Sequence, residues 1–246
     1  MKNMKLASFF FLSIFCTQSA NSAEPVNIPV QNASFEDPGI AMKSHEEQTS
    51  QVGPEGWTWV NALRAAVDNP GDANIFDGGQ EGQLPAPATG MQFAYLNVPP
   101  KKGRTADLLY AGKSLGKFVA GTKYVLTVSV GNRKGFVSPT YWISLSGGKD
   151  ILLGPSASGT APEGSFVDLS VTYTATSEDD NRVIGIQLKA ENNTDKFCPS
   201  SFDNVRLRAI GPIVSPKTFS PTLEIPKFPQ LQDIKELQDK LDEQQK

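Results

Sequence analysis

The sequence predicts an all-β protein, an antiparallel jelly-roll β-sandwich followed by a short C-terminal helix. Three observations lead to this prediction. Apolar and polar residues alternate along many short segments between residues 26 and 210, glycine and proline clusters separate these segments, and no long amphipathic helical pattern interrupts them. Alternation with period two gives a strand one buried face and one face toward solvent or a ligand, and many short strands with such turns are typical of sandwiches and jelly rolls.

Residues 1–23 have the pattern of a secretory signal peptide. Lysines precede an apolar run from Leu6 to Cys16, which is too short to span a bilayer, and a small polar stretch leads to Ala23. We expect cleavage near Ala23 and a periplasmic or secreted protein. Cys198 is then the one remaining cysteine, and a buried core position fits it better than a bond to another chain.

Residues 24–210 form the predicted sandwich domain. Its clearest alternating segments are 91–98, 124–130, 141–145, 168–174, 184–190 and 205–209. Residues 39–90 have a poorer strand pattern and are rich in glycine, proline, asparagine and aspartate. We expect long loops there, which either meet a ligand or are simply solvated.

Two segments follow the sandwich. Residues 211–229 contain five prolines, which predicts a semi-rigid extended linker. Residues 230–246 place Ile234, Leu237 and Leu241 at the spacing of a coiled-coil seam. A helix of about four turns is marginal in water, so we expect it to pack on the sandwich or to join two copies in a homo-oligomer rather than to fray.

Composition excludes several function classes. The 246 residues carry a net charge of −3, which gives no electrostatic reason to expect nucleic acid. No apolar run after the leader is long enough to span a membrane. One histidine and two cysteines exclude most zinc sites, haem, iron–sulfur clusters and the usual histidine-based triads.

Two carboxylates stand near the two ends of the predicted sandwich, Glu36 and Asp203. The first and last strands of a jelly roll commonly lie together, so these side chains can meet. Alternation places Asp203 on the inward face with Val205 and Leu207, where a carboxylate is costly unless something satisfies it. Three solutions stay open: a structural Ca²⁺ held by Glu36 and Asp203, a protonated Asp203 that acts as a general acid, or hydrogen bonds to backbone N–H groups.

Aromatic residues suggest a ligand surface. Trp57, Tyr95 and Trp142 have flat apolar rings that can stack on sugars, although aromatic residues in a sandwich are more often part of the core. Trp142 alternates away from Ile143 and is expected on an outer face. These residues favour a calcium-stabilised, exported binding module for carbohydrate or another cell-surface ligand.

A set of motifs carries a family resemblance. They are Asn-x-Ser-Phe-Glu-x-Pro at 32–38, Gly56-Trp57, Phe93–Leu96, Tyr124–Asn132 and Phe202–Leu207. Over roughly residues 26–210 the chain resembles the Stig cyclases, which are secreted, calcium-binding, hapalindole-type cyclases of indole alkaloid pathways. Their jelly roll belongs to the galactose-binding-like class, which carbohydrate-binding modules share.

The resemblance implies an alternative function. In these cyclases an aspartate on the last strand protonates a prenylated indole and triggers a Cope rearrangement with cyclisation, while a tyrosine and a phenylalanine shape an apolar pocket. The matching positions here are Asp203, Tyr95 and Phe136. Arg133 and Lys134 add charge beside Phe136, and residues 211–246 extend beyond the resemblance to the cyclases.

A third reading is a surface protein that assembles through residues 230–246.

Overall fold

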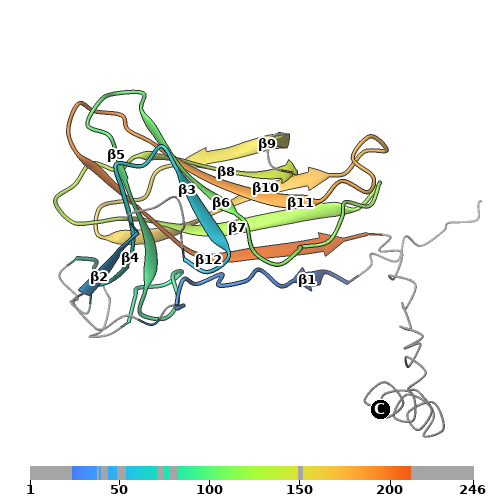
Figure 1. Ribbon diagram of the computed structural model, residues 1–246, viewed down its shortest axis with the longest axis horizontal. Helices are drawn as coiled ribbons and strands as arrows, with labels where there is room; N and C mark the ends of the chain where they lie inside the picture. Colours follow the sequence, from blue (N-terminus) through green and yellow to red (C-terminus); the bar gives the residue numbers. More distant parts are fainter. Residues whose placement is uncertain are drawn as a thin grey trace, which may run out of the picture. The chain divides into compact units, whose positions relative to one another are not determined.

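Two antiparallel sheets packed face to face make up the described part of this computed structural model (Figure 1), which confirms the predicted all-β sandwich. The structure describes residues 24–37, 39, 44–48, 54–70, 75–77, 83–148 and 152–211. The predicted signal peptide, nearly all of the proline linker and the predicted C-terminal helix lie outside these residues. Within them, no helix is long and apolar enough to cross a membrane.

Sheet A has seven strands, in the order β10-β7-β12-β5-β4-β2, with β1 pairing with β12. Its strands are β1 (Val26–Ile28), β2 (Ser44–Gln48), β4 (Arg64–Asn69), β5 (Phe93–Val98), β7 (Lys123–Asn132), β10 (Ser165–Thr174) and β12 (Cys198–Ile210). Sheet B has five strands, in the order β3-β6-β11-β8-β9. Its strands are β3 (Trp57–Val60), β6 (Thr105–Tyr110), β8 (Thr140–Gly147), β9 (Leu152–Gly159) and β11 (Ile184–Glu191).

The alternating segments correspond to strands as predicted, whereas the expectation for residues 39–90 was wrong in part. β2, β3 and β4 lie in that region. β3 has only four residues, Trp-Thr-Trp-Val, so its alternation is too short to stand out in the sequence. Trp57 and Trp59 of β3 are buried, and Thr58 and Val60 are half-buried.

The main core lies between the sheets. Leu126, Val128 and Val130 of β7 are fully buried, and so is Ile143 of β8. The ring of Tyr141 meets that of Phe202 edge to face at 5.2 Å, which joins β8 in sheet B to β12 in sheet A. This contact fixes the inner face of β12 and therefore identifies its outer face.

The core position expected for Cys198 is confirmed. The side chain is fully buried and forms no disulfide. Burial raises the pKa of its thiol to about 11, because desolvation disfavours the thiolate.

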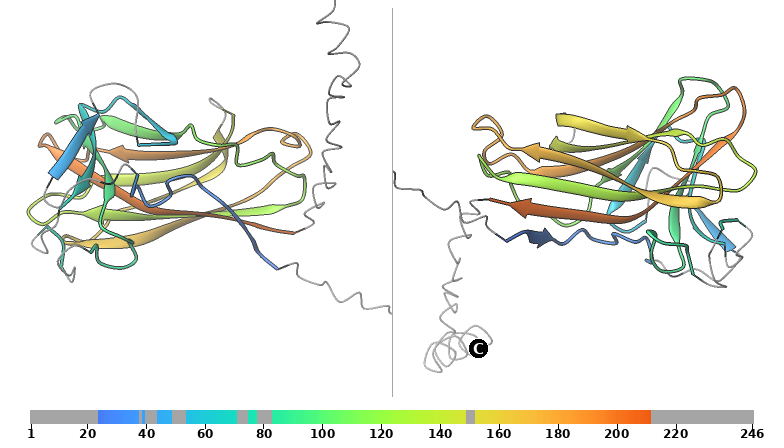
Figure 2. Two further views of the ribbon diagram at one scale, coloured as in Figure 1. Left: turned by 60° about the horizontal axis from the view of Figure 1, so that its bottom comes forward. Right: turned by 180° about the vertical axis from the view of Figure 1, so that it is seen from behind.

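The first and last strands lie side by side, as predicted (Figures 1 and 2). Val26 of β1 pairs with Ala209 of β12. Further back along β12, the register against β7 shifts between Asp203 and Arg206, which marks a β-bulge. Asn204 takes a left-handed backbone conformation there, with a φ of 47°, and the N–H of Val205 donates to the carbonyl of Ala33.

Candidate functional site

Asp203 lies on the outer face of sheet A, immediately before the bulge in β12. Phe202 points into the core against Tyr141, and Val205 and Leu207 are also buried there. One extra residue at the bulge shifts the alternation, so Asp203 lies on the opposite face from Val205. The prediction that these two residues share a face was therefore wrong.

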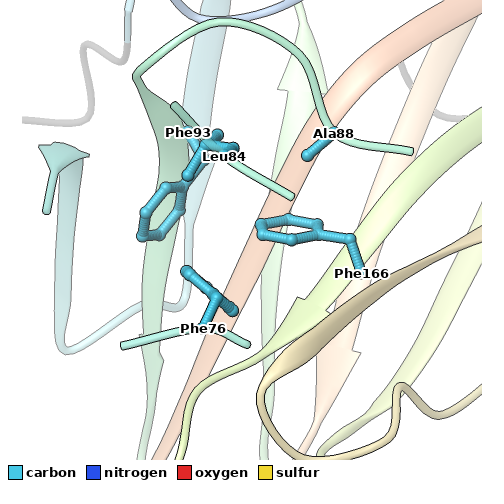
Figure 3. Packing of buried hydrophobic residues seen from close by; sticks show 5 residues of the cluster. All are labelled: Phe76, Leu84, Ala88, Phe93 and Phe166. Carbon is cyan, nitrogen blue, oxygen red and sulfur yellow. The ribbon is translucent and has the colours of Figure 1, made fainter. Parts of the chain in front are cut away.

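A second apolar cluster covers this outer face (Figure 3). Its buried members come from strands β5 and β10 and from the segments before β5, and they are Phe76, Leu84, Ala88, Phe93 and Phe166. Phe76 lies 4.6 Å from Phe166 and 5.6 Å from Phe93 between ring centroids. Gly131 of β7 makes room for this packing, because a Cβ there would lie 2.5 Å from a Phe166 ring carbon.

Asp203 is buried next to this cluster. Phe202 pairs with Ala94 of β5, so Asp203 and Phe93 are the next positions along the two strands and face the cluster side. The Oδ2 atom of Asp203 accepts the N–H of Thr89 at 2.6 Å, one residue after Ala88 of the cluster. Its Oδ1 atom has no hydrogen-bond partner.

Burial raises the pKa of Asp203 well above the ordinary value of 3.8. The backbone N–H groups of Thr89 and Asn204 and the charge of Arg206 oppose this shift, while the negative charge of Glu36 adds to it. Desolvation is the largest of these effects. Asp203 therefore holds its proton to a higher pH than an exposed aspartate does.

Glu36 accepts hydrogen bonds from the same loop, residues 89–92, that contacts Asp203. Its Oε1 accepts the N–H groups of Met91 and Gln92, both at 2.8 Å. Gly90 has a φ of +72°, and a side chain at this position would collide with the Glu36 carboxylate. The two predicted carboxylates are thus brought to one loop, where the negative charge of Glu36 disfavours ionisation of Asp203.

These residues fit a hard cation in part. Two carboxylates that repel each other and a buried oxygen without a partner are groups that Ca²⁺ satisfies. Among the described residues, no group of three or more acidic, histidine or cysteine side chains gathers. The remaining ligands of such an ion would be backbone carbonyls and water.

Tyr95 lies at the edge of the apolar cluster and packs against it. The guanidinium carbon of Arg133 lies 4.3 Å from the centre of the Tyr95 ring and 5.1 Å from that of Phe93. Asp68 of β4 forms an ion pair with Arg133. The side chain of Arg133 is 15% exposed and that of Asp68 is 14% exposed. The guanidinium of Arg133, paired with Asp68, thus lies against the aromatic edge of the apolar cluster.

The other predicted site residues lie elsewhere. Phe136 is 39% exposed in the loop after β7, with its ring 6.2 Å from that of Phe197. Trp142 is half-buried on the outer face of sheet B, where the ammonium of Lys189 lies 4.8 Å from the centre of its ring. Trp57 is packed between Phe35 and Tyr110 and is 2% exposed. Stacking of a sugar on Trp57 was a wrong prediction, because its ring has no free face.

The raised pKa of Asp203 predicts how stability changes with pH. A carboxyl whose pKa is higher in the folded than in the unfolded chain stabilises the fold below its ordinary pKa, and this contribution is lost as pH rises through the folded value. With a chelator present, we expect Asp203→Asn to become progressively more stable than the wild type as pH rises above about 4. Urea unfolding at a series of pH values measures this difference.

The exposed Asp195 provides the control for this titration. Asp195→Asn makes the same chemical change at an exposed position and is measured over the same pH series. Parallel pH profiles for Asp203→Asn and Asp195→Asn would contradict the raised pKa.

Comparison with known proteins places the chain among cyclases. A family model described as HpiC1 cyclase matches residues 26–208. A Stig cyclase, Fisc from Fischerella sp. TAU, in complex with (3Z)-3-(1-methyl-2-pyrrolidinylidene)-3H-indole, is 25% identical with a TM-score of 0.56, over 76% of this chain and 98% of that chain. A cyclase from Fischerella sp. TAU in complex with 4-(1H-indol-3-yl)butan-2-one is 26% identical with a TM-score of 0.57, over 75% and 97%.

Other comparisons add little. The carbohydrate-binding module TmCBM61 in complex with β-1,4-galactotriose is 12% identical, with a TM-score of 0.41, over 74% of this chain and 97% of that chain. No curated protein sequence matches the chain.

Proposed function

The chain belongs to the HpiC1-like cyclase family, and on this premise we propose that it isomerises a prenylated indole by acid-triggered rearrangement and cyclisation. Asp203 is the proton donor. The observation that carries the proposal is a fully buried carboxyl with a raised pKa and an unpartnered Oδ1, set beside an apolar cluster. The indole compounds bound to the two Fischerella cyclases support the substrate class.

The surroundings of Asp203 suit a general acid. An apolar site keeps the carboxyl neutral before the reaction, as desolvation does for other catalytic acids. When the proton moves to the substrate, the N–H groups of Thr89 and Asn204 stabilise the carboxylate that forms. The cationic substrate then loses a proton back to Asp203, so the product is an isomer of the substrate.

Aromatic faces beside the acid suit the cation that this step creates. Phe166 lies in the cluster next to Asp203, and ring faces attract positive charge, whereas the guanidinium of Arg133 already lies over the ring of Phe93. Tyr95 packs at the edge of the cluster and supports its wall. A pocket role for Phe136 stays a prediction, because the structure places its ring against Phe197.

The test is turnover by residues 24–246. Incubation with an indole prenylated at C3 is expected to give a product of unchanged mass with a new retention time and a new ring system by NMR. A folded protein that leaves the substrate unchanged, with and without calcium, would overturn the proposal.

We also propose a structural Ca²⁺ at Glu36. The position of Glu36 supports it, because its Oε1 already accepts the N–H groups of Met91 and Gln92 and an ion at this carboxylate would hold the loop at residues 89–92 in place. A Ca²⁺-bound carboxylate is ionised, so Asp203 cannot be a calcium ligand and the acid at once. Glu36 is accordingly the carboxylate we assign to the ion.

Calcium removal tests this assignment. We expect Ca²⁺ to raise the melting temperature of the wild type over that in chelator, because an ion that binds only the folded state stabilises it. Glu36→Gln is expected to lose this response and Asp203→Asn to keep it. Loss of the response in both variants would make Asp203 a metal ligand and remove its role as the acid.

Carbohydrate binding is not our proposal for this chain. Trp57 is buried, and Lys189 lies over the ring of Trp142. Asp203 is buried as well, but it lies beside an apolar, aromatic cluster against which an indole ring can pack.

Export and self-association complete the proposal. The leader pattern of residues 1–23 supports a periplasmic or secreted protein, and cell fractionation tests this.

The apolar seam in residues 230–246 supports a homo-oligomer. An unchanged mass by light scattering after deletion of these residues would contradict it.

A further inference from the structure

A polar cleft opens on the outer face of sheet A, beyond the bulge of β12. Its volume is about 240 Å³, and it is lined by Val125, Thr127, Asp168, Ser170, Arg206 and Arg208. None of these residues belongs to the apolar cluster around Asp203.

The strand register builds this cleft. Arg206 pairs with Thr127 and Arg208 with Val125, so the two arginines rise from β12 beside a floor formed by β7. Ser170 of β10 pairs with Thr127 from the other side. Three neighbouring strands therefore supply one wall of guanidinium groups, a floor, and one wall of oxygen atoms.

The charges in the cleft do not cancel. Arg206 donates to Asp168 at 2.5 Å, and Asp168 also accepts the hydroxyl of Ser129 at 2.8 Å. Arg208 is exposed and forms no ion pair within the part of the chain that the structure describes. One positive charge is thus left over in the cleft of a chain whose net charge is −3.

Hydroxyl groups stand opposite the free guanidinium. The side chains of Thr127 and Ser170 share a hydrogen bond of 2.8 Å, and each hydroxyl can also donate or accept another. A guanidinium offers a planar fork of N–H donors that matches a carboxylate or a sulfate. The cleft therefore offers a cation and adjacent donors but has only one carboxylate, which Arg206 already uses.

We propose that this cleft binds an oxyanion, a carboxylate or a sulfate, through Arg208 with the hydroxyls of Thr127 and Ser170. The site does not depend on the proposed cyclisation. The oxyanion is either a free ion or an acidic group on a ligand that also reaches Asp203, because Ser129 contacts Asp168 of the cleft and pairs with Asp203.

Titration of ¹⁵N-labelled residues 24–246 at constant ionic strength tests the proposal, with sulfate, acetate and indole-3-butyrate as separate probes. We expect the backbone amides of Thr127 and Ser170 to shift with sulfate and acetate. Arg208→Gln is expected to weaken this binding about fivefold, the effect of losing one charge-assisted contact at an exposed site.

Arg104→Gln is the matched control, because it removes the same charge from an exposed loop position. It is expected to bind both anions as the wild type does. Equal weakening in Arg104→Gln and Arg208→Gln, or no shift at Thr127 and Ser170 with any probe, would overturn the proposal.

Indole-3-butyrate separates the two sources of the anion. Tighter binding than acetate that is lost in Arg208→Gln would show an acidic ligand shared with the Asp203 site. Equal binding of indole-3-butyrate and acetate would show a site for free oxyanions. A loss of cyclase activity in Asp203→Asn with unchanged sulfate binding would show that the two sites are separate.

Discussion

Asp203→Asn is expected to abolish turnover of a prenylated indole while the sandwich stays folded. Asparagine has nearly the same shape and keeps an oxygen that accepts the N–H of Thr89, but it has no acidic proton to give. Loss of a general acid typically lowers a rate by about 10²- to 10⁴-fold. Single-turnover kinetics with saturating enzyme measure this loss without the contribution of product release.

Asp195→Asn again supplies the control, since it removes a carboxyl from an exposed loop. Its rate is expected to equal that of the wild type. Binding of 4-(1H-indol-3-yl)butan-2-one, the compound held by one Fischerella cyclase, would show whether the Asp203→Asn site still accepts an indole. A wild-type rate in Asp203→Asn would assign the proton to another group.

Asp68→Asn is expected to destabilise the fold by about 3 kcal/mol, because it leaves the largely buried guanidinium of Arg133 without its counter-ion. Arg133 lies on the rings of Tyr95 and Phe93, so the same change disturbs the wall of the proposed site. The double variant Asp68→Asn/Arg133→Met should recover most of this loss, since methionine packs on aromatic rings without a charge. Urea unfolding measures all three proteins.

The neighbouring pair of Lys134 and Asp77 is a matched control. Its atoms are 2.6 Å apart, but the side chains are 38% and 70% exposed. Asp77→Asn is therefore expected to cost less than about 1 kcal/mol. Similar costs for Asp68→Asn and Asp77→Asn would contradict the view that the Arg133 pair is structurally important.

Period-two alternation was sufficient to predict most of the sandwich. The faces of β7, β10 and β11 follow directly from residues such as Leu126, Val128 and Val130. β3 was missed because four residues give too little pattern, and its two tryptophans look the same in sequence whether they face a core or a ligand. Only packing against Phe35 and Tyr110 distinguishes these cases for Trp57.

The candidate site was predictable in its residues but not in its geometry. Asp203 and Glu36 were expected to lie together, and they do hold the same loop. The face of Asp203 could not be predicted, because the sequence around Asn204 has no clear sign of a bulge. Phe76 and Phe166 were missed because they lie 90 residues apart, and only the folded sheet and its covering loop bring their rings together.

The protonation state of Asp203 tests the central claim most directly. In calcium-free protein labelled with ¹³C at aspartate carboxyls, the resonance that disappears in Asp203→Asn belongs to Asp203. We predict that it titrates well above the range of exposed aspartates, so that the buried carboxyl is neutral where those are ionised. Titration of this resonance together with the exposed aspartates would contradict Asp203 as the acid of a cyclase.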